Sequence, residues 1–168
     1  MTWQYVSHWK IDAPPYLVWA AITETEHWPR WWRHVRHVEV VRRGDGTGLG
    51  AIRRIDWVTQ LLYGFTIEVE CTEVRPQRLL RGRARGAIDG EGVWELAPDG
   101  DGTAVTYTWS AELRARWMQV VAPWMAPVFR WNHERVMQSG EEGLKRLMHA
   151  ALAGQAKPSA AGSSRESP

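Results

Sequence analysis

A hydrophobic pattern with helical spacing lies near the C-terminal end of the chain. Its small or apolar residues, with one amide among them, stand at Met125, Phe129, Asn132, Val136, Gly140, Gly143, Leu147 and Ala151. Because the steps are three or four residues long, they predict one face of a long α-helix. Such a face has to be buried, and the segments before it offer the largest surface. Gly140 and Gly143 leave room on it for a close neighbour, either a strand or a ligand.

Alternating apolar and polar residues predict seven strands before this helix. The predicted strands are Trp3–Asp12, Arg36–Arg43, Leu49–Val58, Phe65–Val74, Arg78–Arg85, Ile88–Leu96 and Thr103–Leu113. Two short helices are expected between the first two strands, from Tyr16 to Ile22 and from Glu24 to Trp28, with Pro29 ending the second. The short turns favour sequential antiparallel pairing. One face of the sheet is apolar and the other polar, so we expect the long helix to cover the apolar face.

Composition limits the possible classes of protein. Apolar content of 44% and charged content of 24% indicate one soluble globular domain over residues 1–153, and the small, polar segment 154–168 is expected to be a disordered tail. The 21 basic residues are interspersed with 19 acidic ones, which argues against a nucleic-acid binder. No signal pattern or membrane-length apolar run is seen, so a cytoplasmic location is expected. With a single cysteine, Cys71, and no HExxH motif, no metal is expected.

Aromatic residues are the unusual part of the composition, because 12 tryptophans accompany only 2 phenylalanines and 4 tyrosines. So many large rings in a small domain suggest either bulky packing or the wall of an apolar cavity. Residues 30–37 interleave arginines and histidines with Trp31 and Trp32; the rings could pack on the core, touch a membrane or partner, or stack on bases. Residues 117–127 contain two prolines and look too broken for a regular helix. They could form a flexible lid that touches membranes transiently, or a buried extension of the long helix.

Two sets of arginines need an explanation. Arg81, Arg83 and Arg85 alternate along one strand, and we expect Glu68 and Glu70 of the neighbouring strand to hold them on the polar face. A single arginine, Arg53, shares its side of a strand with Ile55 and Trp57 and should therefore face inward. A buried charge has to be paired, so Arg53 either binds a ligand or reaches water near the strand end.

The order of elements resembles the START-like helix-grip (SRPBCC) superfamily, and within it the bacterial polyketide cyclase/dehydrase and lipid transport family. The resemblance covers roughly residues 3–152. It rests on Ile11-Asp12-Ala13-Pro14, Trp28-Pro29-Arg30-Trp31-Trp32, Gly92-Val93-Trp94-Glu95-Leu96, residues 102–107 and Phe129-Arg130-Trp131-Asn132-His133. It implies an α+β fold in which a seven-stranded antiparallel curved sheet wraps around a long C-terminal helix. It also implies a cavity between sheet and helix that holds a hydrophobic or aromatic small molecule.

We therefore predict a site for a lipid-like or polyketide-like ligand, without a cofactor. Its predicted lining is Arg53, Trp57, Ile67, Val69, Trp94, Tyr107, Trp109, Met125, Phe129 and Asn132. Asn132, with Arg53 second, would orient the ligand. The alternative is a cyclase or aromatase in which Tyr107, Asn132 and Arg53 polarise a carbonyl, although no activated base is evident. A fainter alternative is a partner-binding module. The sequence does not specify the ligand, the catalytic residues or the oligomeric state.

Overall fold

A computed structural model describes residues 2–60, 64–112 and 116–155. The elements are β1 (Thr2–Ile11), α1 (Pro15–Thr23), the 3-10 turn η1 (Thr25–His27), α2 (Trp28–Trp31), β2 (Val35–Arg42), β3 (Ile52–Val58), β4 (Gly64–Arg75), β5 (Leu79–Gly86), β6 (Asp89–Asp99), β7 (Gly102–Glu112) and α3 (Arg116–Gln155). Within these residues, none of the helices has both the length and the hydropathy that crossing a lipid bilayer requires.

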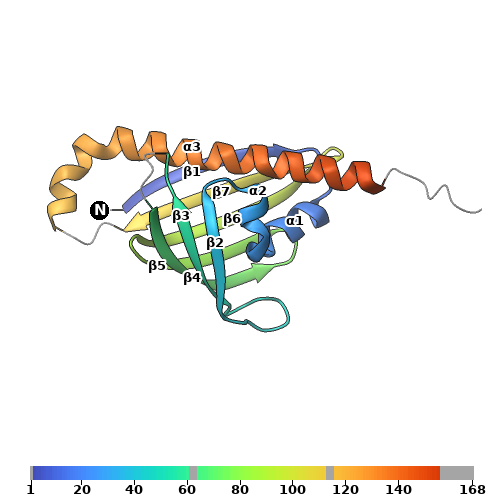
Figure 1. Cartoon of the computed structure of the whole chain (residues 1–168), viewed down its shortest axis with the longest axis horizontal. Coiled ribbons are helices and arrows are strands. Elements are labelled where there is room, and N and C mark those ends of the chain that lie inside the picture. The colour runs from blue at the N-terminus through green and yellow to red at the C-terminus, as the bar shows by residue number, and fades with distance from the viewer. Residues whose placement is uncertain (1, 61–63, 113–115, 156–168) are drawn as a thin grey trace, which may run out of the picture.

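The seven strands form one antiparallel sheet in the order β1-β7-β6-β5-β4-β3-β2. Strands β2 to β7 pair in sequence as their short connections require, and β1 joins the free edge of β7. Figure 1 shows the curved strands beneath α3, with α1 and α2 under the C-terminal half of that helix. The predicted α+β helix-grip fold is confirmed in strand number, pairing and helix order.

The short helices differ from the prediction at Pro29. We expected this proline to end a helix, but it occupies the first turn of α2, which continues to Trp31. Proline is tolerated there because the amide groups of a first turn have no partner inside the helix. The continuation matters, because it directs Trp31 and Trp32 into the core.

Helix α3 begins earlier than expected, at Arg116, and runs for 40 residues. The prediction that residues 117–127 are too broken for a regular helix is wrong. Pro123 and Pro127 lie one turn apart, so the two backbone hydrogen bonds that they remove fall on nearly the same side, and the helix bends instead of ending. Figure 1 shows the first turns of α3 curving beyond the end of the sheet. At the other end, α3 includes Gly154 and Gln155, the first two residues of the expected tail; residues 156–168 lie outside the described part.

The buried face of α3 is centred one residue beyond the predicted stripe. Leu144, Met137 and Met148 are 0%, 4% and 5% exposed, whereas Val136 and Leu147 are only partly buried. The neighbour that Gly140 and Gly143 admit is α2 with the residue that follows it. A Cβ atom added at Gly140 would lie 2.6 Å from Trp32 Cε2, and one at Gly143 would lie 1.8 Å from the Trp31 carbonyl oxygen.

Trp31 and Trp32 are core residues. Their rings stack at 5.4 Å, and they are 6% and 1% exposed. The Trp32 indole N–H donates a hydrogen bond to the Val136 carbonyl oxygen of α3 at 2.9 Å. Of the alternatives left open by the sequence, packing on the core is therefore the one that the structure adopts for these two rings.

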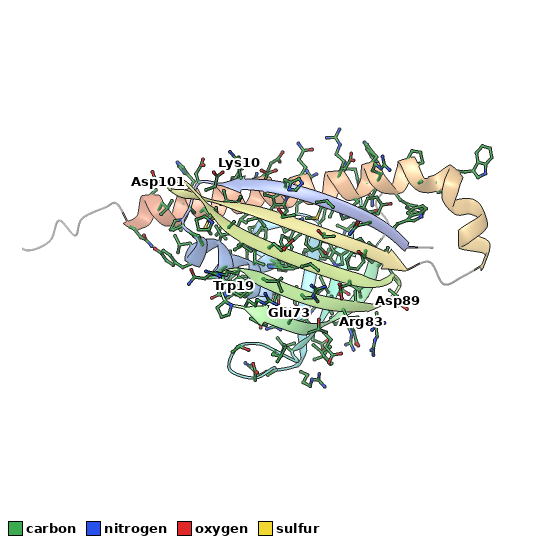
Figure 2. All side chains as sticks on the ribbon, turned by 180° about the vertical axis from the view of Figure 1, so that it is seen from behind. Lys10, Trp19, Glu73, Arg83, Asp89 and Asp101 are labelled. Carbon is green, nitrogen blue, oxygen red and sulfur yellow. The ribbon has the colours of Figure 1, made fainter. Side chains whose placement is uncertain are left out.

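The outer face of the sheet carries charged pairs, as Figure 2 shows for the side of the molecule that bears Glu73 and Arg83. Arg81 pairs with Glu73 at 3.1 Å and with Glu91 at 2.7 Å. The expected partners, Glu68 and Glu70, instead pair with Arg54 and Arg42. The Arg81 guanidinium is held by carboxylates as predicted, although the residue also borders the inner cavity. The partners differ because Glu68 and Glu70 pair with arginines on the other side of β4.

Candidate functional site

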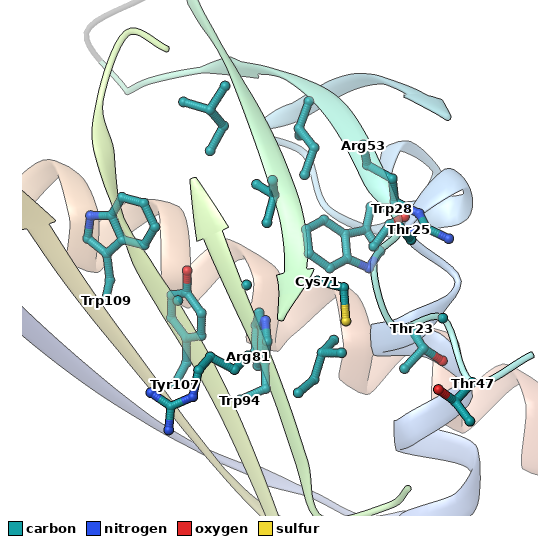
Figure 3. A pocket seen from close by; sticks show the side chains of 18 of the residues that line it. Thr23, Thr25, Trp28, Thr47, Arg53, Cys71, Arg81, Trp94, Tyr107 and Trp109 are labelled. Carbon is teal, nitrogen blue, oxygen red and sulfur yellow. The ribbon is translucent and has the colours of Figure 1, made fainter. Parts of the chain in front are cut away.

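A cavity of about 280 Å³ lies on the inner face of the sheet. Strands β3 to β7 form most of its wall, and the segment from Thr23 to Trp28 and the loop between β2 and β3 complete it (Figure 3). Its lining residues are Thr23, Thr25, Trp28, Gly46, Thr47, Gly48, Ala51, Arg53, Ile55, Trp57, Ile67, Val69, Cys71, Leu80, Arg81, Gly82, Gly92, Trp94, Tyr107 and Trp109. None of these residues belongs to α3.

One part of the wall is aromatic. Trp94 on β6 and Tyr107 on β7 are register partners, and their rings lie 4.2 Å apart. Trp94 also packs 5.2 Å from Trp9, so the cavity wall continues into the core. Aromatic contacts of this kind each add about 0.5–1.5 kcal/mol beyond the area they bury. The wall is thus a rigid, largely preformed surface for an apolar or aromatic body.

Glycines make space for this wall. A Cβ atom added at Gly92 would lie 2.7 Å from the Tyr107 hydroxyl oxygen. One added at Gly90 would lie 3.0 Å from Trp109 Cζ2 and 2.4 Å from the Ser110 carbonyl oxygen. The large rings of β7 lie across β6 only because these inward positions carry no side chain.

The other part of the wall is polar. Arg53 faces inward as predicted, and its side chain is 22% exposed. Its Nε lies 3.5 Å from Glu26 Oε2 of η1, and the Thr25 hydroxyl donates to the same carboxylate oxygen at 3.2 Å. Burial raises the pKa of Glu26, but a hydrogen bond from its own backbone N–H, the charge of Arg53 and the Thr25 hydroxyl together lower it below the ordinary value. Glu26 thus stays ionised and holds Arg53 at the cavity wall.

Two further polar groups in the cavity are neutral at ordinary pH. Burial raises the pKa of the Tyr107 hydroxyl well above its usual value of 10.0, so this group stays protonated and can donate a hydrogen bond. Figure 3 shows the hydroxyl directed into the cavity. Burial also raises the pKa of the Cys71 thiol, which the charge of Arg53 only partly opposes. Among the described lining residues there is no Asp, Glu or His.

The structure brings seven of the ten predicted site residues together around this cavity. They are Arg53, Trp57, Ile67, Val69, Trp94, Tyr107 and Trp109. All seven were placed inward by period-two alternation along a strand. The structure places these side chains around one cavity, and their roles in ligand binding stay a prediction.

The three predicted site residues of α3 lie elsewhere. Asn132 accepts a hydrogen bond from the Gln60 backbone N–H at 3.1 Å and so ties α3 to the end of β3. Phe129 packs 5.7 Å from the Trp3 ring of β1. Met125 is half-buried and does not line the cavity. The reason is geometric: α3 runs along β1 and the short helices, at one side of the sheet, whereas the cavity is built on β3 to β7.

Sequence reasoning missed several cavity features. Glu26 was assigned to a short helix, and no spacing rule connects it with Arg53, 27 positions later. Trp28 was not predicted to line the cavity, because the helix that contains it was expected to end at Pro29 and not to continue to Trp31. Of the β6 glycines, Gly92 appeared only within a motif and Gly90 was not considered. Gly90, Gly92 and Trp94 alternate, which is a signal for an inward face that lacks side chains beside one large ring.

Comparisons with known proteins agree with this architecture. The model of a family described as "Polyketide cyclase / dehydrase and lipid transport" matches residues 2–149. A comparison with curated proteins finds no match.

Several solved structures share the fold. A START superfamily protein from Mycobacterium smegmatis superposes with a TM-score of 0.73 at 11% identity, covering 88% of this chain and 98% of its own. The Zhui aromatase/cyclase from a Streptomyces species superposes with a TM-score of 0.72 at 15% identity. The match covers 97% of this chain and 100% of the Zhui chain. The protein TTHA0849 from Thermus thermophilus gives 0.66 at 22% identity, covering 86% and 98%. At these identities the likeness concerns the fold alone.

Proposed function

The chain belongs to the polyketide cyclase/dehydrase and lipid transport family, and we propose that it binds an amphipathic small molecule with an aromatic or hydrophobic body and an oxygen-bearing, preferably anionic, head. The observation that carries this proposal is the division of one cavity into an aromatic wall and a polar wall that contains Arg53. Ligand pockets are mostly apolar with a few polar groups that fix orientation, and this cavity has that composition.

The aromatic wall supports the choice of body. Trp57, Trp94, Tyr107 and Trp109 present ring faces and edges to the same volume, and such surfaces favour flat apolar groups. The volume of about 280 Å³ is near the lower end of the range of roughly 300–1,000 Å³ typical of small-molecule sites. A compact ring system therefore suits the cavity better than a two-chain lipid.

The polar wall supports the choice of head. The Nε of Arg53 is buried against Glu26, while its side chain keeps 22% of its surface exposed. The guanidinium can thus keep its contact with Glu26 and offer other N–H groups to a ligand oxygen. The Thr25 hydroxyl already donates to Glu26, so the charged donors that the proposal assigns to the ligand at this end are the other N–H groups of Arg53.

Two dyes that differ in one group test both halves of the proposal. 8-Anilinonaphthalene-1-sulfonate has an aromatic body and an anionic head, and N-phenyl-1-naphthylamine has the same rings without the sulfonate. We expect both to bind the folded protein and to quench part of its Trp fluorescence. The variant Arg53→Met should weaken the sulfonate dye about tenfold or more, because a charged hydrogen bond contributes about 1.5–3 kcal/mol, and should leave the neutral dye unchanged. Trp109→Ala should weaken both.

The location of the dyes can be checked independently with Cys71, which lines the cavity and is the one cysteine of the sequence. Either dye should slow the reaction of this thiol with a maleimide in proportion to occupancy. A control variant, Tyr16→Ser, changes an exposed aromatic residue on α1 and should leave both affinities unchanged. Dye binding that neither Trp109→Ala nor maleimide labelling of Cys71 affects would contradict a site in this cavity.

One observation favours a second function, ring closure of a polyketide-like substrate. The protonated Tyr107 hydroxyl points into the cavity and could donate to a substrate carbonyl. Abstraction of a carbon-bound proton also needs a base, and the described lining residues include no carboxylate or imidazole. We therefore favour ligand binding over catalysis as the function of this cavity. Native mass spectrometry of protein purified from its own host distinguishes the two: a carrier releases its copurified ligand unchanged, whereas a cyclase releases a product that has lost water.

A further inference from the structure

The N-terminal half of α3 exposes an aromatic stripe that faces away from the sheet. Trp124, Val128 and Trp131 are 85%, 36% and 41% exposed, and exposed Arg135 continues the same line. Because the steps between these residues are four, three and four, they occupy one face of the helix. Three of the seven exposed large hydrophobic side chains in the described residues thus lie within eight positions of one another. Isolated exposed apolar residues are ordinary, but a stripe of this kind marks an interaction surface.

The opposite face of the same helix segment is already occupied. Phe129 packs on Trp3, and His133 stacks on Tyr5 with the ring centroids 4.8 Å apart. These contacts fix the rotation of α3 against β1, so the outer stripe cannot turn inward without breaking them. Figure 1 shows this end of α3 reaching past the strands, where no other described element covers its outer side.

The charge around the stripe is positive. Among residues 124–135, whose side chains the structure describes, there are two arginines, Arg130 and Arg135, and one acid, the exposed Glu134. Arg130 is exposed beside the stripe, and the Arg135 guanidinium carbon lies 6.0 Å from the centre of the Trp131 ring. A guanidinium against an indole face is held by a cation–π contact. Arg135 is therefore positioned at the level of the exposed rings.

We propose that this face of α3, defined by Trp124, Val128, Trp131 and Arg135, with Arg130 at its flank, docks on an anionic lipid surface. Tryptophan suits the boundary between lipid headgroups and acyl chains, because its ring is apolar and its N–H is polar. Arginine attracts anionic headgroups, and each cation near such a surface contributes about fivefold in affinity. An amphipathic helix that combines the two lies in the plane of the membrane surface without crossing it.

The charge also decides between a membrane and a second copy of the chain. A symmetric contact through this face would bury the two arginines against a second copy whose residues 124–135 offer one acid, Glu134, and charges left unpaired at an interface oppose association. An anionic lipid surface neutralises them.

Flotation with vesicles tests the proposal on the full chain. We expect the protein to float with mixed phosphatidylglycerol–phosphatidylcholine vesicles, to bind pure phosphatidylcholine vesicles at least about tenfold more weakly, and to dissociate from the anionic vesicles as salt rises. The double variant Trp124→Ser/Trp131→Ser should lose about tenfold or more of its affinity for anionic vesicles. Its fold should be retained, because both rings are exposed, and circular dichroism checks this.

Matched variants separate this face from the rest of the surface. Arg130→Gln/Arg135→Gln should weaken binding to anionic vesicles and reduce its salt dependence, with no loss on phosphatidylcholine. Tyr16→Ser removes a 54% exposed aromatic residue from α1, and Arg83→Gln removes an exposed charge from β5; neither should change vesicle binding. The proposal does not depend on the ligand, because the stripe and the cavity lining share no residue.

Three outcomes would overturn the proposal: no flotation with anionic vesicles, equal flotation with both kinds of vesicle, or binding that survives Trp124→Ser/Trp131→Ser. Analytical ultracentrifugation of the protein without lipid tests whether a second copy of the chain occupies this face instead. A dimer that becomes monomeric in the double Trp variant would assign the stripe to a second copy and would also overturn the membrane proposal.

Discussion

At the scale of single residues, the cavity depends on positions that carry no side chain. Tyr107 and Trp109 on β7 each lean across β6, where Gly92 and Gly90 leave their Cβ positions empty. Interiors are packed closely enough that one added methyl group is felt. The cavity wall is therefore set by β6 as much as by the aromatic residues that face the ligand.

Gly92→Ala should destabilise the protein and narrow the cavity. Its new Cβ would lie 2.7 Å from the Tyr107 hydroxyl oxygen and would push the ring toward the cavity or force β6 away from it. We expect a loss of about 1–3 kcal/mol in the free energy of unfolding by urea, with weaker binding of N-phenyl-1-naphthylamine. Gly46→Ala is the matched control, since no atom lies within 4 Å of its added Cβ. Equal losses in the two variants would show that crowding against Tyr107 is not the cause.

His133 should make the stability of the fold depend on pH. Burial lowers its pKa from 6.5 to about 4, so below pH 6.5 the unfolded chain takes up a proton that the folded chain does not. Stability should consequently fall as the pH decreases from 6.5 to about 4, by at most about 3 kcal/mol from this group. His133→Phe keeps a ring against Tyr5 without titrating. Urea unfolding measures the free energy of unfolding of both proteins at each pH. The difference between His133→Phe and the unaltered protein should increase by that amount from pH 6.5 to about 4. A difference that does not change with pH would contradict the lowered pKa of His133.

How far the sequence predicts the site is clear from Arg53, Glu26 and Asn132. Period two placed Arg53 inward correctly, because strand alternation is a local property. Its partner Glu26 is distant in sequence and lies in a 3-10 turn, where no periodicity exists. Asn132 was read from a helical face that is correct in spacing but rotated by about one residue, and only tertiary packing sets that rotation. The local pattern of residues therefore predicts which way a strand side chain points. Contacts between residues distant in sequence, such as Arg53 and Glu26, have to be seen in the structure.

At the scale of elements, the junction between α2 and α3 holds the short helices to the long one. Gly143 lets the α3 backbone approach the Trp31 carbonyl, and Gly140 accommodates the Trp32 ring. His34, which follows this segment, is 3% exposed, and its Nδ1 lies 2.6 Å from Ser139 Oγ of α3. The two glycines were predicted to admit a strand or a ligand, and a tryptophan-bearing helix takes that place.

Gly143→Ala should separate these elements. The added Cβ would lie 1.8 Å from a backbone oxygen, which cannot rotate away as a side chain can. We expect a loss of about 3 kcal/mol or more in the free energy of unfolding, at the upper end of overpacking effects. Gly154→Ala on the same helix meets no atom within 4 Å and should be neutral or stabilising by up to about 1 kcal/mol, because alanine favours helix. Similar values for the two would mean that α2 and α3 are not packed as described.

The elements that were predicted well and poorly differ in physical origin. Strand order follows from short connections and alternation, so all seven strands were identified with bounds shifted by a few residues. The start of α3 was left open between a lid and an extension of the long helix, because two prolines normally argue against a helix interior; the extension is the alternative that the structure adopts. Because the two prolines are one turn apart, the backbone hydrogen bonds that they remove lie on nearly the same side of the helix. The helix therefore bends and does not end.

At the scale of the whole molecule, α3 has two halves with different roles. Its C-terminal half buries Met137, Leu144 and Met148 against the rest of the fold. Its N-terminal half contacts β1 through Phe129 and His133 and leaves Trp124 and Trp131 exposed. The cavity lies apart from both, on β3 to β7. Ligand binding and surface docking can therefore be altered separately by mutation.

Hydrogen exchange should resolve the two halves of α3. Opening of a helix segment requires its buried contacts to break, so amides at residues 137–148 should exchange close to the rate of global unfolding. Amides at residues 124–131 break fewer buried contacts when they open, and Pro123 and Pro127 leave two carbonyls of this half without an amide donor. We expect their protection factors to be lower by about a hundredfold or more, a free-energy difference of about 3 kcal/mol. Mass spectrometry of peptides from the two halves measures this difference directly. Anionic vesicles should raise protection in 124–131 and leave 137–148 unchanged, whereas N-phenyl-1-naphthylamine should protect peptides of β3 to β7. Uniform protection along α3 would contradict the division, because it would mean that the helix opens as one cooperative unit.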